Sequence, residues 1–198
     1  MNRLGLVYER GAAGKVQDPV QAMNWFRKSA DAGSAFGNWL FAQGRATELS
    51  ASSSAEAARA EVGPLLQQAF ECAKNGAEQG RLDGVLTLGL SHRFGTGTPR
   101  NILLGETWLA KAAARGDDEA QLELGDMYAS DEMAASNRLP YKPQAGVELL
   151  KKSAAAGNTM AMRLLADLLR QGRLGAWTSA DGTARFMIDR TIPSRRTA

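Results

Sequence analysis

The chain has 198 residues, of which 44% are apolar, enough to bury the core of one domain or of one short repeat array. A single cysteine excludes an internal disulfide framework, and the formal net charge of +3 is mild. No apolar run approaches the roughly 20 residues that a membrane-spanning helix needs, so the sequence predicts no transmembrane segment.

The first 33 residues predict a helix, a turn and a second helix. The chain starts with LGLVYERG, Leu4 to Gly11, and continues with VQAMNWFRKSADAG, Val20 to Gly33. Asp18-Pro19 predicts the start of the second helix, since an acidic residue caps a helix N-terminus and proline suits the first helical position. Asn101 holds the same cap position in a later unit. Gly33 predicts the end of the helix, because glycine adopts the left-handed conformation that closes helices.

These two phrases recur along the chain. Closing glycines stand at Gly33, Gly80, Gly116 and Gly157, at steps of 47, 36 and 41 residues. Eight residues after the last three come Leu88-Gly89, Leu124-Gly125 and Leu165-Ala166. The period predicts pairs of helices of about a dozen residues on a basic 36-residue unit. The expected units are about 1–33, 34–80, 81–116, 117–157 and 158–193, followed by a flexible basic tail at 194–198.

The repeated positions predict how one unit packs. Glycine in the Leu-Gly pair costs up to about 1 kcal/mol of helix propensity, so it indicates close approach of a neighbouring helix. One position of the second helix should be its main core residue: Trp25, Cys72, Trp108 and Leu149. Alanine five residues later should keep the facing helix near: Ala30, Ala77, Ala113 and Ala154. We expect Trp108→Ala to cost roughly 3–5 kcal/mol. Units that cannot cover their own apolar faces must stack, so the fold class predicted is all-α, an α/α superhelical solenoid.

Two segments exceed the basic unit. The Ser/Ala-rich stretch TELSASSSAEAA, residues 47–58, is expected to form an extended loop that is mobile and dispensable around Leu49–Ala57. A longer loop, ASDEMAASNRLPYKP, is expected at residues 129–143.

At these residues the sequence resembles the Sel1-like repeat family, which is related to tetratricopeptide repeats. LGLVYERGAAGKVQDPVQAMNWFRKSADAG and LGLSHRFGTGTPRNILLGETWLAKAAARG match the family pattern at most positions, while Phe41-Ala42 stands where Leu-Gly belongs. The resemblance implies a bacterial protein that acts through protein–protein interaction. Family members often carry disulfides between the helices of a repeat, which a lone cysteine rules out here.

Residues that could support catalysis are scarce. His92, the only histidine, occupies a tyrosine position and is expected to be a packed aromatic substitute, and Cys72 is expected to be a small buried residue. FGTGTPRN lacks the lysine and the hydroxyl residue of a phosphate-binding loop. Asp117–Glu119 suits a helix start, where acidic side chains favour the dipole. We therefore expect no enzymatic activity, no catalytic residue, no cofactor and no metal site.

A stripe on the first helices is predicted to bind the partner on the concave face of the solenoid. Its residues lie two before, two after and five after each leucine of the Leu-Gly position, on one helical face. They are Asn2, Leu6 and Glu9; Trp39, Gln43 and Ala46; Leu86, Leu90 and Arg93; Leu122, Asp126 and Ala129; and Arg163, Asp167 and Arg170. Its centre is apolar and its ends are charged, as in interaction surfaces. Alternatively, the positions are assigned to the wrong faces of the first helices by one residue, and Trp39, Leu86 and Leu122 belong to the core.

The function expected is a non-enzymatic adaptor or regulator that binds a protein or peptide and no nucleic acid, as a monomer. The alternative is an inhibitor or immunity protein that neutralises a bacterial toxin. A third possibility is an enzyme, since some relatives have been linked to β-lactam binding, but the sequence offers no nucleophile with a base. Met1 falls inside a repeat, so we expect a fragment of a longer protein. A cytoplasmic location is expected, with a periplasmic or secreted one left open.

Overall fold

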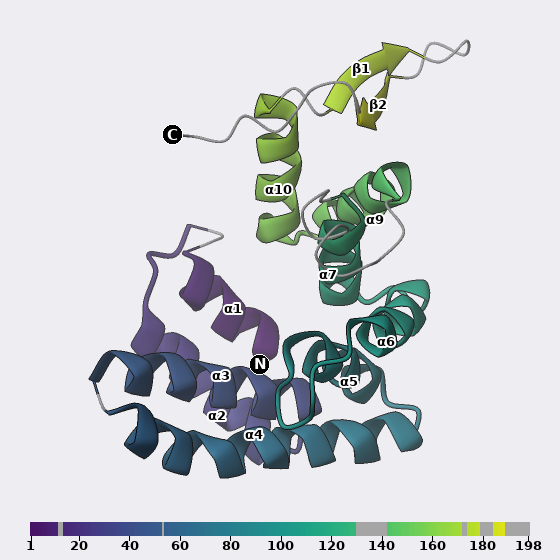
Figure 1. Ribbon diagram of the computed structural model, residues 1–198. Coiled ribbons are helices and arrows are strands. Elements are labelled where there is room, and N and C mark those ends of the chain that lie inside the picture. Colours follow the sequence, from purple (N-terminus) through teal and green to yellow (C-terminus); the bar gives the residue numbers. More distant parts are fainter. Residues whose placement is uncertain (12–13, 53, 130–141, 172–173, 179–183, 189–198) are drawn as a thin grey trace. The chain divides into compact units, whose positions relative to one another are not determined.

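The computed structural model describes residues 1–11, 14–52, 54–129, 142–171, 174–178 and 184–188. They belong to two compact units, Met1–Arg115 and Gly116–Ala198, and each is described by itself. Helices dominate both units, so the predicted all-α class is confirmed (Figure 1).

The first unit consists of helical hairpins. Its helices are α1 (Asn2–Arg10), α2 (Pro19–Asp31), α3 (Ala35–Ser52), α4 (Ala55–Glu78), α5 (Leu82–Phe94) and α6 (Ile102–Ala114). They pair as α1 with α2, α3 with α4 and α5 with α6. Successive hairpins are joined because α2 also packs on α3, and α4 on α5.

The second unit begins with the same arrangement and then departs from it. Helix α7 (Asp118–Ala129) pairs with α9 (Pro143–Ala155), and α10 (Thr159–Arg170) packs on α9. The sequence predicts a helical unit through residue 193, but two strands follow instead, β1 (Leu174–Thr178) and β2 (Ala184–Ile188), paired antiparallel. An Asp-Gly pair in the intervening sequence is typical of hairpin turns. The basic tail and most of the predicted loop at 129–143 lie outside the described residues.

The helix ends match the prediction. The closing glycines Gly33, Gly80, Gly116 and Gly157 have φ of 77°, 71°, 87° and 91°, all in the left-handed region. The Asp18 carboxylate accepts a 3.0 Å hydrogen bond from the backbone N–H of Gln21, and Pro19 is the first helical residue. The Asn101 side chain accepts from the N–H of Leu104 at 3.1 Å.

The predicted core position of the second helices is wrong by one residue. Trp25, Cys72, Trp108 and Leu149 are all only half-buried. The fully buried position is the next one along, filled by Phe26, Ala73, Leu109 and Leu150, at 0–1% exposure. Beside the predicted alanines the buried position is one residue earlier, at Ser29, Gly76, Ala112 and Ser153, three residues after the core position. One residue is a rotation of about 100° on a helix, and adjacent positions are apolar in every unit, so the pattern could not distinguish them.

The half-buried tryptophans are covered by lysines from their own helices. The Lys28 ammonium lies 4.8 Å from the centre of the Trp25 ring, and that of Lys111 lies 4.1 Å from the Trp108 ring. Trp108 also packs against the core cluster that contains Leu88. The tryptophan position therefore lies at the edge of the core, where the ring can be covered by a side chain three residues later.

The Ser/Ala-rich segment is mostly helical, so the prediction of an extended loop is wrong. Helix α3 continues through Ser52, and α4 starts at Ala55 with the Ser54 hydroxyl accepting from the N–H of Ala57 at 3.3 Å. Alanine, leucine and glutamate are strong helix formers and outweigh the serines here. The surplus residues therefore lengthen α3 and α4 into an elongated hairpin of 18- and 24-residue helices.

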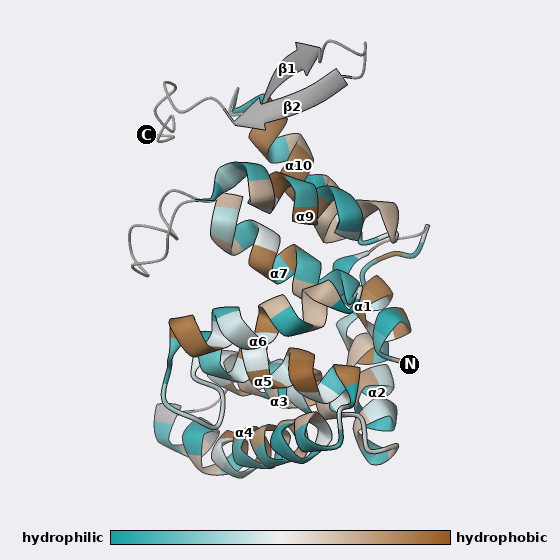
Figure 2. Ribbon diagram, turned by 90° about the vertical axis from the view of Figure 1, so that its right-hand side faces the viewer, coloured by the Kyte–Doolittle hydropathy of each residue, from teal (hydrophilic) through white to brown (hydrophobic). Residues whose placement is uncertain are grey.

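No helix among the described residues combines the length and apolar character that a bilayer crossing would require. Figure 2 shows hydrophilic and hydrophobic residues mixed along the helices.

Candidate partner-binding surfaces

The apolar part of the predicted stripe lies in the core, so its assignment to an exposed surface is wrong. Its buried members are Leu6, Leu86, Leu90, Arg93, Leu122 and Ala129, with exposures of 8%, 2%, 1%, 4%, 3% and 3%. Helix α5 explains three of them, because it packs against α3, α4 and α6 together. A helix with neighbours on several sides buries most of its side chains, so at these positions the alternative interpretation, that the stripe belongs to the core, is correct.

The remaining stripe residues are at least partly exposed: Asn2, Glu9, Trp39, Gln43, Ala46, Asp126, Arg163, Asp167 and Arg170. In the second unit, Asp126 and Asp167 line a small cavity of about 180 Å³ together with Leu164 and Leu168. The Arg170 guanidinium pairs with Asp167 at 2.9 Å. The buried stripe residue Ala129 of α7 lines this cavity as well.

In the first unit, Trp39 belongs to a group of aromatic rings. Its ring centre lies 6.1 Å from that of Phe36 and 6.1 Å from that of Phe94. Phe94 is 48% exposed, and the Arg93 guanidinium lies over its ring at 4.9 Å. Gln43, one turn along α3 from Trp39, donates to the Thr96 hydroxyl at 3.1 Å.

We call this surface the aromatic face and define it by Phe36, Trp39, Gln43, Phe94 and Thr96. Trp39 and Gln43 belong to the stripe predicted from the sequence, whereas Phe36, Phe94 and Thr96 do not. Phe94 and Thr96 stand at the end of α5 and just beyond it, outside the repeat positions on which the stripe was built. The available signal in the sequence was a phenylalanine directly before Gly95, the glycine that ends α5.

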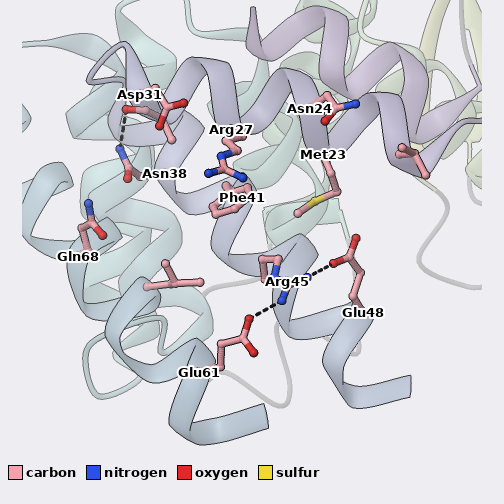
Figure 3. A pocket seen from close by; sticks show the side chains of 13 residues that line it. Met23, Asn24, Arg27, Asp31, Asn38, Phe41, Arg45, Glu48, Glu61 and Gln68 are labelled. Atoms are coloured by element: carbon pink, nitrogen blue, oxygen red, sulfur yellow. Dashed lines mark hydrogen bonds and ion pairs between the residues drawn. The ribbon is translucent and has the colours of Figure 1, made fainter. Parts of the chain in front are cut away.

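A larger groove opens on the opposite side of α3 (Figure 3). It has a volume of about 1000 Å³ and runs between α2, α3 and α4. Its apolar walls come from Val20, Met23, Phe41 and Leu65. None of the predicted stripe residues lines it. At about 100° per residue, Phe41 points roughly 200° away from Trp39, so a stripe drawn on one face of α3 could not include this groove.

Charged side chains at one end of the groove pair with each other (Figure 3). Arg45 of α3 donates to Glu48 at 2.7 Å and to Glu61 of α4. Hydrogen bonds to Glu61 and then to Glu48 raise the pKa of Arg45 above its ordinary value. The amide of Asn38 donates to the Ala30 carbonyl at 3.5 Å. We call Arg45, Glu48 and Glu61 the Arg45 triad. Its Arg45–Glu61 pair links α3 to α4 at this end of the groove.

A second, smaller pocket lies between α3 and α4. Its volume is about 330 Å³, and its walls are Ala46, Arg59, Val62, Gly63 and Leu66. Ala46 is the third stripe residue of α3, after Trp39 and Gln43. We call it the apolar pocket, because Arg59 is its single charged wall residue.

The isolated titratable groups are packing residues. The His92 ring meets Phe70 edge-on at 5.7 Å, and burial lowers the pKa of His92. Cys72 is half-buried, not fully buried as predicted, and burial raises the pKa of its thiol. Asp117 accepts a 2.8 Å hydrogen bond from the backbone N–H of Ala120 at the start of α7, where the sequence predicted an acidic helix start. Burial raises the pKa of the Asp117 carboxyl. A raised thiol pKa disfavours the nucleophilic thiolate.

Comparison with known proteins assigns the repeats. The Sel1 repeat model matches residues 1–34, 88–117 and 118–158, more than half of the chain, and leaves out the whole of the elongated hairpin. A Sel1 repeat protein from Oxalobacter formigenes is similar in structure, with 23% identity and a TM-score of 0.48 over 87% of this chain and 63% of its own. A protective antigen present in uropathogenic Escherichia coli strains, described as displaying an SLR fold, shares 20% identity with a TM-score of 0.48, over 86% of this chain and 41% of its own.

This chain therefore spans less than two thirds of either solved structure. No match was found among the curated proteins compared. The assignment rests on the repeat model, whose matched ranges coincide with the units in which Leu-Gly and the closing glycine recur. The chain belongs to the Sel1 repeat family.

Proposed function

We propose that this chain is a non-enzymatic protein-interaction module that binds a protein or peptide partner on the first-helix face of its repeats, centred on the aromatic face. Sel1 repeat proteins generally mediate protein–protein interactions. What supports this location is the half-exposed Phe94 ring, which lies tilted against the Trp39 ring and has the Arg93 guanidinium over it.

The aromatic face has the composition of a binding hot spot. Tryptophan, tyrosine and arginine dominate the residues whose truncation costs most at interfaces, and aromatic rings are enriched there. Phe94 and Trp39 present ring surface, while Gln43 supplies a polar group at its side, held by its hydrogen bond to the buried Thr96. A partner that covers Phe94 would remove its exposed apolar surface from water, and Trp39 and Arg93 hold the ring in place beforehand.

The test starts with the partner, captured from the source cells by pull-down of the tagged chain, identified by mass spectrometry, and then purified. Calorimetric titration compares the parent with Phe94→Ala. We expect about a thirtyfold loss of affinity, equivalent to about 2 kcal/mol for an aromatic anchor. Val20→Ala is the matched control, because Val20 is 70% exposed but lines the groove on the other side of α3.

Circular dichroism and thermal melting verify that both variants fold. A Phe94→Ala variant that binds like the parent would reject the aromatic face. If Val20→Ala weakens binding instead, the partner occupies the groove of Figure 3.

A further inference from the structure

The elongated hairpin carries the apolar pocket by itself. The apolar pocket is built entirely from residues 46–66 of α3 and α4, where the chain exceeds the basic repeat. Its volume of about 330 Å³ is at the lower end of ligand sites, which span roughly 300–1000 Å³. It therefore has room for an amino-acid side chain and little more.

One wall of the pocket is left open by Gly63. A Cβ atom placed on Gly63 would meet no other atom within 4 Å. Gly63 precedes Pro64 inside α4, and the proline ring clashes with the Cβ of a preceding helical residue. Glycine relieves that clash and leaves a notch in the helix surface beside Val62 and Leu66.

The charge at the pocket is unbalanced. Arg59 lies one helical turn before Gly63 and is exposed. Within the described part of the chain no hydrogen bond or ion pair of Arg59 is found. Arg45 on the other side of α3 is different, since two glutamates engage it. An apolar cavity beside an uncompensated guanidinium is complementary to an apolar group that carries a carboxylate.

The pocket continues the aromatic face. Trp39, Gln43 and Ala46 are spaced i, i+4 and i+7 and lie along one side of α3. Seven residues of helix cover about 10 Å, the reach of about three extended residues. A partner segment lying along α3 over Trp39 would therefore reach the pocket beyond Ala46.

We propose that the apolar pocket takes a bulky apolar side chain of the partner segment while Arg59 pairs with a carboxylate adjacent to it. The partner motif is then an apolar residue flanked by aspartate or glutamate, about three residues from the residue that lies over Trp39. The proposal rests on the proposed function, because it assigns the partner chemistry of the same interface.

The experiment selects phage-displayed random dodecapeptides on the full chain and measures the affinity of the enriched peptides for defined variants. We expect enrichment of a bulky apolar residue next to an acidic one. Arg59→Glu should weaken those peptides by about tenfold or more, as expected for a lost charged hydrogen bond. Ala46→Phe should do the same by filling the pocket. Arg27→Glu is the matched control, being an exposed arginine that lines the groove of Figure 3.

The outcomes separate the two proposals. If selected peptides depend on Phe94 but tolerate Arg59→Glu and Ala46→Phe, the pocket proposal is rejected and the aromatic face stands. If they depend on Arg59 and Ala46 but not on Phe94, the pocket stands and the aromatic face does not. Enrichment without an acidic residue, or no enrichment, rejects the pocket proposal. Arg59→Glu alters only an exposed side chain, so it remains informative if Ala46→Phe disturbs the hairpin.

Discussion

Gly89 of α5 lies directly against Leu109 of α6, so closely that a Cβ atom on Gly89 would be 2.9 Å from the Leu109 Cγ atom. Gly125 has the same 2.9 Å relationship to Leu150. In both hairpins the glycine of the Leu-Gly pair faces the residue that follows the tryptophan position. The recurring contact is the interlocking point of the repeat, and it sets the distance between the two helices.

Gly89→Ala should therefore destabilise the protein. Overpacking costs about 1–3 kcal/mol, and the improved helix propensity returns at most about 1 kcal/mol. Urea unfolding measures the difference. The cost should shrink in part when Leu109→Ala is also present, because the side-chain contact is removed while the Leu109 backbone nitrogen, also 2.9 Å from the added Cβ, remains. Equal costs in both backgrounds would contradict the contact.

The one-residue shift of the core position can be tested with two adjacent leucines. Leu150 is 1% exposed and Leu149 is half-buried, so the same substitution probes both environments. Leu150→Ala should cost about 2–5 kcal/mol of unfolding free energy as a core deletion, and Leu149→Ala clearly less. Chemical denaturation measures the unfolding free energy of both variants. A larger loss for Leu149→Ala than for Leu150→Ala would mean that the core position inferred from the sequence is correct.

The Arg45 triad should hold the elongated helices together. Arg45→Met keeps much of the side-chain length but removes the hydrogen bonds to Glu48 and Glu61. We expect faster amide hydrogen exchange at the facing ends of α3 and α4, with little change in α6. Arg59→Met is the control on the same hairpin, and it should leave exchange unchanged. Similar exchange in the two variants would mean that the triad contributes no rigidity.

The single histidine gives a clean pH test. Burial lowers the pKa of His92 below its ordinary 6.5 in the folded protein, so the unfolded chain binds the proton more strongly. The contribution of neutral His92 to stability is therefore present above pH 6.5 and is lost as pH falls from 6.5 through the folded-state pKa. His92→Phe should weaken this dependence and keep the edge contact with Phe70. NMR titration of the His92 ring checks the direction, and a midpoint above 6.5 would contradict it.

The local features of this protein were readable from its sequence. The repeat, the helix caps at Asp18 and Asn101, and the left-handed glycines depend on residues only a few positions apart. The Leu-Gly pair also predicted close helix approach correctly, because glycine within a helix is costly unless a neighbour needs the space. Trp39, which the sequence placed on the binding stripe, is partly exposed and packs against Phe36 and Phe94, and its role in binding stays a prediction.

Only the tertiary structure decided which side of each helix meets the core. Phe26 rather than Trp25, and Leu109 rather than Trp108, fill the contact with the first helix, and both choices fit an apolar stripe equally well. Leu90 was misplaced because α5 is enclosed by three helices at once. Rotation, enclosure and the pockets around the elongated hairpin depend on contacts between segments distant in sequence. Helical periodicity describes one helix and carries no information on how many neighbours surround it.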